Sequence, residues 1–145
     1  MSDMDAEVRR LLDERAIRRA ATLYAIGADR RDPAIWTDIM AEDMVLITPR
    51  GRIDGRDRVL AALPKLAAAF TATQHHVTNQ LHMIDGDGAT GETYCVADHM
   101  TQAADGSRSI LRWAIRYQDE LRRTGDRWRF TRRELILDWE ERRSA

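Results

Sequence analysis

Apolar residues recur at three- and four-residue spacing in the first part of the chain and alternate with polar residues in the second part. From Asp5 onward the spacing predicts an amphipathic helix whose apolar positions are Val8, Leu11, Leu12, Ile17, Ala20, Ala21, Tyr24 and Ala28. Asp32 and Pro33 supply the cap and the first residue of a second helix, over 33–40. The beginning of the chain is therefore predicted to be helical.

The next segment is predicted to contain one strand and one interrupted helix. Residues 44–48 are apolar and β-branched, which favours a strand, and Pro49, Arg50 and Gly51 follow it as a turn. Residues 58–63 have the pattern of a helix that Pro64 must kink or divide before 67–70, because proline removes a helical hydrogen bond.

Four long strands are predicted after Phe70. Alternating segments cover 71–84, 89–103, 109–122 and 128–139, and turns rich in Gly and Asp separate them at 85–88, 104–107 and 124–126. We expect an antiparallel meander and a single α+β domain over 1–145, in which a curved antiparallel sheet wraps around the N-terminal helices. Such a cone would enclose an internal apolar pocket lined by inward-facing strand residues.

The alternation predicts which strand residues face that interior. In 71–84, His75 shares the more apolar face with Val77, Asn79, Leu81 and Met83, which places His75 inward and His76 and His82 outward. In 89–103, Asp98 shares a face with the large residues Tyr94, Val96 and Met100, and His99 lies on the opposite face. An inward carboxylate among apolar residues needs a partner, and Arg112 and Arg133 are the candidates for a salt bridge.

The last strand changes its apolar face partway along. Trp128 and Phe130 stand at even-numbered positions, whereas Leu135, Leu137 and Trp139 stand at odd-numbered ones. In a regular strand the two sets would face opposite sides of the sheet. A β-bulge near 131–134 would explain the change, and it would redirect the side chain of Arg132 or Arg133.

Composition and charge exclude several function classes. The chain has 23 basic and 24 acidic residues and a formal net charge of −1, so we expect neither a nucleic-acid partner nor an anionic membrane partner. No segment approaches the roughly 18 apolar residues of a membrane span, and the N-terminus lacks a signal-peptide pattern, so a cytoplasmic location is expected. The single cysteine, Cys95, excludes an internal disulfide and is expected to be a small buried residue.

The sequence also gives no sign of a metal or cofactor. Neighbouring strand residues diverge, so His75, His76 and Asp98 cannot converge on one ion, and no HExxH pair is present. Gly51-x3-Gly55 lacks the spacing of a dinucleotide fingerprint. We expect chemistry that side chains alone can perform.

The order of elements and a set of short motifs resemble the SnoaL-like branch of the nuclear-transport-factor-2-like superfamily. The motifs are Tyr24-x4-Asp29-x2-Asp32, Gly51-x3-Gly55, Gln74-His75, Asp85-Gly86-Asp87 and Gly125-x2-Trp128-x4-Arg133. This branch includes scytalone dehydratase, bile-acid 7α-dehydratase, lindane dehydrochlorinase and, more distantly, ketosteroid isomerase. The resemblance extends from about Ile17 to Trp139, and it implies a cone-shaped fold that serves many chemistries.

The resemblance also implies roles for individual residues. Asp29 and His75 match an Asp–His dyad, and Tyr24 matches a tyrosine on the pocket side. Asp98 falls where one dehydratase has a second acid and another has a second histidine, so a shift of one residue would give this position to His99. Arg133 matches an arginine that some members place near a leaving group.

A dyad of this kind suits proton abstraction without a cofactor. The carboxylate of Asp29 would fix the tautomer of His75, the other ring nitrogen would take the proton, and Tyr24 would donate to the developing oxyanion. Asp98, if protonated, or Arg133 would assist the departing group. We therefore expect a lyase, most of all a dehydratase, or an isomerase that acts on a small hydrophobic molecule of steroid, terpenoid or aromatic type.

Two other function classes remain open at this stage. The first is a non-catalytic binding module or accessory subunit of the same fold. The second is other catalysis in the same cone, such as polyketide cyclisation or an epoxide hydrolysis in which Asp98 and Arg133 would act together. A homodimer or homotrimer is expected in each case.

Overall fold

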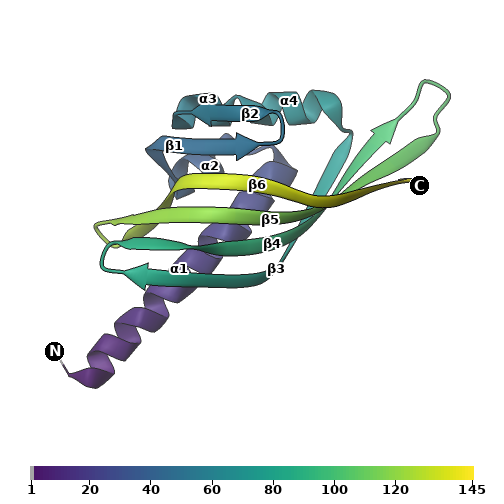
Figure 1. Cartoon of the computed structure of the whole chain (residues 1–145). Coiled ribbons are helices and arrows are strands. Elements are labelled where there is room, and N and C mark those ends of the chain that lie inside the picture. The colour runs from purple at the N-terminus through teal and green to yellow at the C-terminus, as the bar shows by residue number, and fades with distance from the viewer. Residues whose placement is uncertain (1) are drawn as a thin grey trace.

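The structure is a computed structural model that describes residues 2–145. Its helices are α1 (Asp3–Arg30), α2 (Pro33–Ile39), α3 (Arg56–Leu60) and α4 (Ala62–Ala69). Its strands are β1 (Met40–Thr48), β2 (Gly51–Asp54), β3 (Ala72–Asp85), β4 (Gly88–Gln102), β5 (Arg108–Thr124) and β6 (Arg127–Ser144). Figure 1 shows the strands as one curved sheet that α1 crosses.

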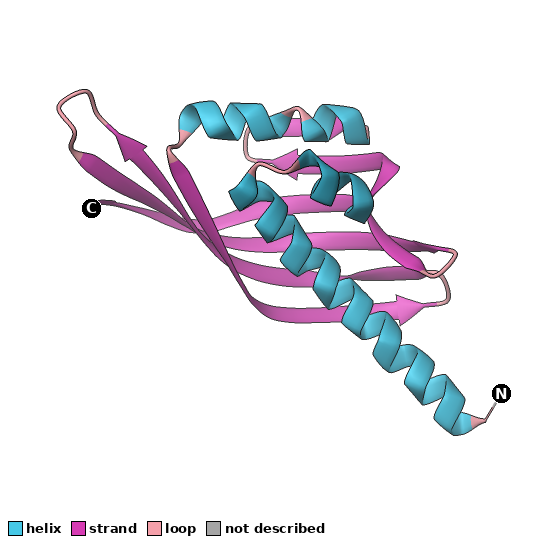
Figure 2. Cartoon of the chain, turned by 180° about the vertical axis from the view of Figure 1, so that it is seen from behind, coloured by secondary structure: helices cyan, strands magenta, loops and turns pink. Residues whose placement is uncertain are grey.

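The six strands form one sheet in the order β2-β1-β6-β5-β4-β3. All neighbouring strands are antiparallel except β1 and β6, which run parallel. The helices lie on one face of this sheet (Figure 2). The predicted α+β class and the meander of long strands are confirmed, whereas the parallel pairing of β1 with β6 was not predicted.

The first helix begins and ends where local chemistry favours it. Ser2 caps α1 by accepting from the Asp5 amide, and the Asp5 side chain accepts from the Ser2 amide, which satisfies two of the free N–H groups. The buried positions cluster in the second half of the helix, at Ile17, Ala20, Ala21, Tyr24, Ala25 and Ala28. The first turns of α1 extend beyond the sheet (Figure 1).

The helices α1 and α2 pack closely through Gly27. A Cβ at Gly27 would lie 2.4 Å from Cδ1 of Trp36, so only glycine permits this approach. Trp36 donates from its indole nitrogen to the Tyr24 carbonyl at 2.9 Å, and its ring stacks on the Tyr24 ring. The helix pair therefore presents Tyr24 to the sheet as part of a rigid aromatic unit.

The segment from 40 to 70 differs in detail from the prediction. The strand expected at 44–48 starts four residues earlier as β1, and the turn after it leads into a short additional strand, β2. The interrupted helix divides at Ala61, not at Pro64. Pro64 lies in the first turn of α4, where its missing N–H has no partner to lose.

A β-bulge in β3 overturns part of the predicted inward face. The pairing of β3 with β4 shifts between Val77 and Gln80, so residues after the bulge change sides. Leu81 and Met83, which were predicted inward, are 79% and 75% exposed, and His82 points inward instead. The prediction for His75 survives because this residue precedes the bulge.

The bulge predicted in the last strand is confirmed. The β5–β6 register shifts between Glu120 and Leu121, opposite Thr131, and it brings Arg133 to the inner face with no exposed surface. A second shift between Ala114 and Ile115 reverses the parity again. Trp139, which was predicted to share the face of Leu135 and Leu137, is therefore 55% exposed.

The core lies between the helices and the inner face of the sheet. It contains the aromatic side chains of Tyr24, Trp36, Tyr117, Trp128 and Phe130, with aliphatic residues around them. Cys95 is buried in this core, as expected. Across residues 2–145, no helix has the length and apolar character that crossing a membrane requires.

Candidate functional site

Asp29 and His75 form a close dyad at the C-terminal end of α1. The Oδ1 atom of Asp29 lies 2.6 Å from Nδ1 of His75, and the backbone N–H of His75 donates to Oδ2 of Asp29 at 2.9 Å. The side chains are 22% and 8% exposed, respectively. The helix end and the start of β3 are thus tied together by one carboxylate, which leaves the imidazole little freedom to turn.

Two further residues hold the carboxylate in place. The Thr73 hydroxyl donates to Oδ1 of Asp29 at 3.0 Å, and Arg31 donates to the Thr73 hydroxyl at 2.6 Å. Arg31 also donates to the carbonyl of Ala28 at 2.6 Å, near the end of α1. Arg31 itself adopts the left-handed conformation that ends the helix, with φ of 54°.

The geometry keeps Asp29 charged and determines which ring nitrogen of His75 carries the proton of their hydrogen bond. Burial works against the Asp29 carboxylate, but the hydrogen bonds from the side chain and backbone of His75 outweigh it and lower the pKa of Asp29. A carboxylate only accepts, so Nδ1 of His75 carries the proton of this hydrogen bond. In the neutral imidazole, Nε2 then has a free lone pair and is able to act as a base.

His99 lies beside the dyad, which corrects the prediction that it faces outward. Its ring centroid is 5.8 Å from that of His75, in an edge-on arrangement, and the rings of Phe70 and Trp113 enclose it at 4.7 Å each. Nδ1 of His99 donates to the carbonyl of Leu111 at 3.1 Å. Burial lowers the pKa of His99, so this residue is a neutral imidazole with its Nε2 unengaged.

Asp98 does not face the interior, so that prediction is wrong. The strands β4 and β5 pair without a register shift, and the buried positions in β4 are Cys95, Ala97 and His99, of the opposite parity to Asp98. Asp98 accepts from Nε and Nη2 of Arg112, both at 2.8 Å, and this pairing lowers the pKa of the carboxyl. The salt bridge to Arg112 that the sequence left open is the one that forms.

Arg133 lies fully buried at the centre of an aromatic cluster. Its Cζ atom is 4.5 Å from the ring centroid of Tyr24, 4.0 Å from that of Tyr117 and 4.4 Å from that of Phe130. Nε and Nη2 donate to Asp119 at 2.7 and 3.0 Å, whereas Nη1 is buried without a hydrogen-bond partner. The cation is therefore held in one orientation with one donor group unused.

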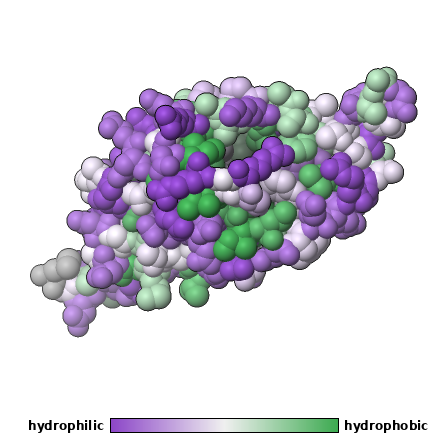
Figure 3. Space-filling view, turned by 45° about the horizontal axis from the view of Figure 1, so that its top comes forward, coloured by the Kyte–Doolittle hydropathy of each residue, from purple (hydrophilic) through white to green (hydrophobic). Residues whose placement is uncertain are grey.

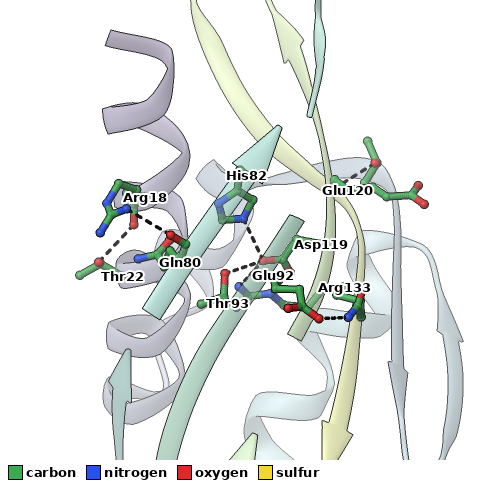
Figure 4. Close-up of polar contacts among 11 residues, drawn as sticks. Arg18, Thr22, Gln80, His82, Glu92, Thr93, Asp119, Glu120 and Arg133 are labelled. Atoms are coloured by element: carbon green, nitrogen blue, oxygen red, sulfur yellow. Dashed lines mark hydrogen bonds and ion pairs between the residues drawn. The ribbon is translucent and has the colours of Figure 1, made fainter. Parts of the chain in front are cut away.

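Asp119 organises a buried polar network around Arg133 (Figure 4). Thr93 donates to its Oδ2 atom at 2.7 Å, and Nε2 of His82 lies 3.4 Å from the same atom. Burial opposes the charge of Asp119, but the charge of Arg133 and these hydrogen bonds outweigh it and lower the pKa of Asp119 to about 2. Arg133 pairs with Asp119 and not with Asp98, so the Asp98–Arg133 pair considered for epoxide hydrolysis does not form.

Tyr24 belongs to this aromatic cluster, and no hydrogen bond among residues 2–145 joins it to the dyad. Burial raises the pKa of the Tyr24 phenol to about 12, so the hydroxyl is a neutral donor near pH 7. On the inner face of β4, Cys95 lies between Ala97, which pairs with His75, and Thr93, which donates to Asp119. Burial raises the pKa of the Cys95 thiol to about 12. The dyad and the Arg133 cluster therefore flank one stretch of the inner sheet face.

Two cavities of the structure lie outside this stretch. One, of about 460 Å³, opens between β1, α3, β5 and β6, and the other, of about 160 Å³, lies between α1, α2 and the start of β6. The predicted apolar pocket at the dyad stays a prediction. Within residues 2–145, no three His, Cys, Asp or Glu side chains are grouped so as to hold a metal ion.

Sequence reasoning placed His82 and His99 outward and did not single out Asp119, whereas all three belong to the inner site. The resemblance placed a second histidine one residue from His99. The alternation of small buried residues along β4 (Ala89, Thr93, Cys95, Ala97) was a further sign that His99 lies on the inner face of this strand. Asp119 alternates with Ile115 and Tyr117 on the apolar side of β5, so its burial was visible in the pattern.

Comparisons with known proteins agree with this architecture. Residues 9–134 match the model of the SnoaL-like domain family. A protein of unknown function from Mycobacterium tuberculosis has a TM-score of 0.77 and 26% identity over 95% of this chain and 77% of its own. A search of curated proteins by sequence found no match.

Two further solved structures share the fold at lower identity. A protein described as a scytalone dehydratase from Novosphingobium aromaticivorans has a TM-score of 0.80 and 23% identity, over 93% of this chain and 90% of its own. A hexachlorocyclohexane dehydrochlorinase, LinA type 3 from Novosphingobium barchaimii, has a TM-score of 0.81 and 16% identity, over 94% of this chain and 93% of its own. With the family model matching nearly the whole fold, the chain belongs to the SnoaL-like domain family.

Proposed function

We propose that the chain is a cofactor-independent lyase, a dehydratase, that acts on a small hydrophobic cyclic substrate through His75 and Asp29. The observation that carries the proposal is the 2.6 Å contact between Nδ1 of His75 and Oδ1 of Asp29, with the backbone N–H of His75 on the second oxygen. A double tether of this kind orients a base, and orientation is a requirement of general base catalysis.

In the proposed reaction, Nε2 of His75 removes a proton beside a carbonyl or a leaving group. Asp29 stabilises the imidazolium that forms, because its lowered pKa keeps it negatively charged. The imidazolium of His75 then returns this proton to the departing hydroxide, so that water leaves and His75 is neutral again. His99 carries its ring proton on Nδ1, so its Nε2 lone pair accepts a hydrogen bond from the substrate hydroxyl and orients it, in place of the acid that the sequence assigned to Asp98.

In the proposed reaction, Tyr24 and Arg133 stabilise the negative charge that develops on the substrate away from the base. The Tyr24 hydroxyl stays protonated near neutral pH, and Nη1 of Arg133 is a buried donor with no partner. Donors that are fixed before the reaction stabilise a departing anion at little reorganisation cost. An isomerase would use the same base and donors without loss of a group, so the products of the reaction distinguish the two.

The experiment is a screen of steroid, terpenoid and aromatic hydroxy-ketones for loss of water, followed by two substitutions in the dyad. His75→Ala and Asp29→Asn are each expected to lower kcat at least about a hundredfold, the usual contribution of a general base. His76→Ala is the matched control, because this neighbouring histidine is exposed on the other face of β3. It is expected to keep full activity.

Three outcomes decide the proposal. Full activity of either dyad variant on a confirmed substrate would contradict the assigned base. Tight binding of such compounds without turnover would favour the non-catalytic module. Water loss that fails only in the dyad variants would support the dehydratase.

A further inference from the structure

The larger cavity lies at the end of the sheet opposite the dyad. It measures about 460 Å³ and is lined at the starts of β1, α3 and β6 and the end of β5. Along β5, Leu111 pairs with His99, and Arg122 follows eleven residues later, about 35 Å further along an extended strand. None of the residues that line this cavity belongs to the dyad or to the Arg133 cluster. It is therefore a separate site.

Three arginine side chains from three elements converge on this cavity, which we call the arginine groove: Arg56 of α3, Arg122 of β5 and Arg129 of β6. Arg129 donates from Nε to the carbonyl of Asp38 at 3.1 Å, and its two amino groups have no hydrogen-bond partner within residues 2–145. Nε of Arg56 is buried and also lacks a partner. Several charged donors at this place are thus unused.

Two carboxylates share the groove, and one of them demonstrates how an anion is held there. Asp43 accepts from both amino groups of Arg122, at 3.2 and 3.0 Å. The Glu42 side chain is 91% exposed and lies 3.9 Å from Arg56, beyond hydrogen-bond distance. With three guanidinium groups and two carboxylates, the groove keeps an excess of positive charge.

We propose that the arginine groove binds a small molecule that carries a phosphate or carboxylate group. Guanidinium groups form bidentate hydrogen bonds with both kinds of anion. The cavity volume also falls in the range of small-molecule sites, about 300–1,000 Å³. The bound anion would pair with Arg129 and Arg56 and compete with Asp43 for Arg122. Because the groove lies away from the dyad, the ligand is not the substrate of the proposed dehydratase.

Pyrophosphate and citrate are the probes. Each is titrated separately into the 145-residue chain while its amide and arginine N–H signals are recorded by NMR. We expect a saturable shift with a Kd below about 1 mM for at least one probe. The shifts should fall on 41–43, 122–124 and 129 and spare 73–75. A response to pyrophosphate alone identifies a phosphate ligand, and a response to citrate alone identifies a carboxylate ligand.

Four substitutions distinguish a specific binding site from nonspecific electrostatic attraction. Arg129→Gln and Arg122→Gln are each expected to weaken binding at least about tenfold, or ~1.4 kcal/mol. Asp43→Asn is expected to strengthen binding, since it removes the competing carboxylate, and damage to the fold would not produce this opposite sign. Arg50→Gln, in the exposed turn after β1, is the matched control and should change nothing. The absence of a saturable shift with both probes, or equal weakening by Arg50→Gln, would overturn the proposal.

Discussion

At the scale of single residues, the inner face of the sheet holds two histidines in different environments. His75 is paired with a carboxylate, whereas His99 is enclosed by the rings of Phe70 and Trp113 and donates only to a carbonyl. Both have their Nδ1 engaged, so both direct Nε2 away from their partners. Two imidazoles whose ring centroids lie 5.8 Å apart suit a reaction in which His75 moves a proton and His99 orients the substrate hydroxyl by accepting a hydrogen bond from it.

His99 is expected to make the stability of the fold depend on pH. Burial lowers the pKa of His99 below 6.5, so the unfolded chain takes up a proton at a higher pH than the folded chain does. The stability that neutral His99 contributes is therefore complete above the unfolded pKa of 6.5. It is lost as the pH falls from there through the lower pKa of the folded state. Urea unfolding of the His99→Asn variant should show a smaller loss of stability between about pH 7 and pH 5 than the wild type.

The control for this measurement is His76→Asn, because His76 is exposed on the outer face. Its pH dependence is expected to follow that of the wild type. An unchanged slope in His99→Asn would mean that His99 does not titrate as its surroundings predict.

The buried Asp119–Arg133 pair is expected to contribute more to conformational specificity than to the free energy of unfolding. Asp119→Asn leaves the guanidinium buried without its counter-charge and should cost about 3–5 kcal/mol of unfolding free energy. Replacing both partners, as Asp119→Leu with Arg133→Met, should recover most of that loss, because no buried charge remains. Urea unfolding of Asp119→Leu alone, Arg133→Met alone and the double variant completes the double-mutant cycle. Equal stability of the single and double variants would contradict this account.

At the scale of elements, the close approach of α1 and α2 determines where Tyr24 lies. Trp36 reaches over Gly27, stacks on the Tyr24 ring at 4.7 Å between centroids and donates to the Tyr24 carbonyl. The aromatic pair holds α2 against α1, and Asp38 ties the same helix to Arg127 and Arg129 of β6. The same pair supports one side of the Arg133 cluster.

Gly27→Ala is expected to destabilise the fold even though alanine favours helices. The helical preference for alanine would add about 1 kcal/mol, but the new Cβ would lie 2.4 Å from Trp36 and force it to move. Overpacking of this kind costs about 1–3 kcal/mol, so the net change should be a loss. Tryptophan fluorescence and thermal unfolding measure both effects. Thr22→Ala, at an exposed position of α1, is the control and should stay within about 0.5 kcal/mol of wild type.

At the scale of the whole molecule, apolar side chains remain uncovered at the start of α1 and on strands of the sheet. The projecting start of α1 carries exposed side chains at Met4, Val8, Leu11 and Leu12, spaced along one stripe. Hydrophobic residues also gather in the middle of a largely hydrophilic face (Figure 3). A stripe of this kind on a helix that leaves the domain favours contact with another protein surface.

We propose that a second copy of the chain covers the stripe in a homodimer or homotrimer. Sedimentation should then give a mass above the 16.7 kDa of one chain. Leu11→Glu combined with Leu12→Glu should shift the protein toward the monomer, because both side chains are more than half exposed in the single chain. Arg9→Glu, on the same helix, is the control for a change of charge alone. A wild-type monomer at all concentrations would contradict the proposal.

The sequence by itself determined the class of the fold, most of the elements and the Asp–His dyad. Helical and strand periodicities are local properties, so they predicted α1, α2 and the four long strands. A resemblance from about Ile17 to Trp139 matched Asp29 and His75 to a dyad. The bulge at Thr131 was also visible, because Phe130 and Leu135 are both apolar yet have opposite parities. Apart from the dyad, which joins two elements, each of these features depends on residues whose pattern is set within one element.

Only the tertiary structure decided which side chains meet. A strand places alternate residues on opposite faces, so the bulge between Val77 and Gln80 was enough to turn Leu81 outward and His82 inward. The choice between Asp98 and His99 depended on the register of β4 against β5, where Asp98 finds Arg112 and His99 finds the Leu111 carbonyl. Such partners are non-local, and their energies cannot be compared until the strands are paired.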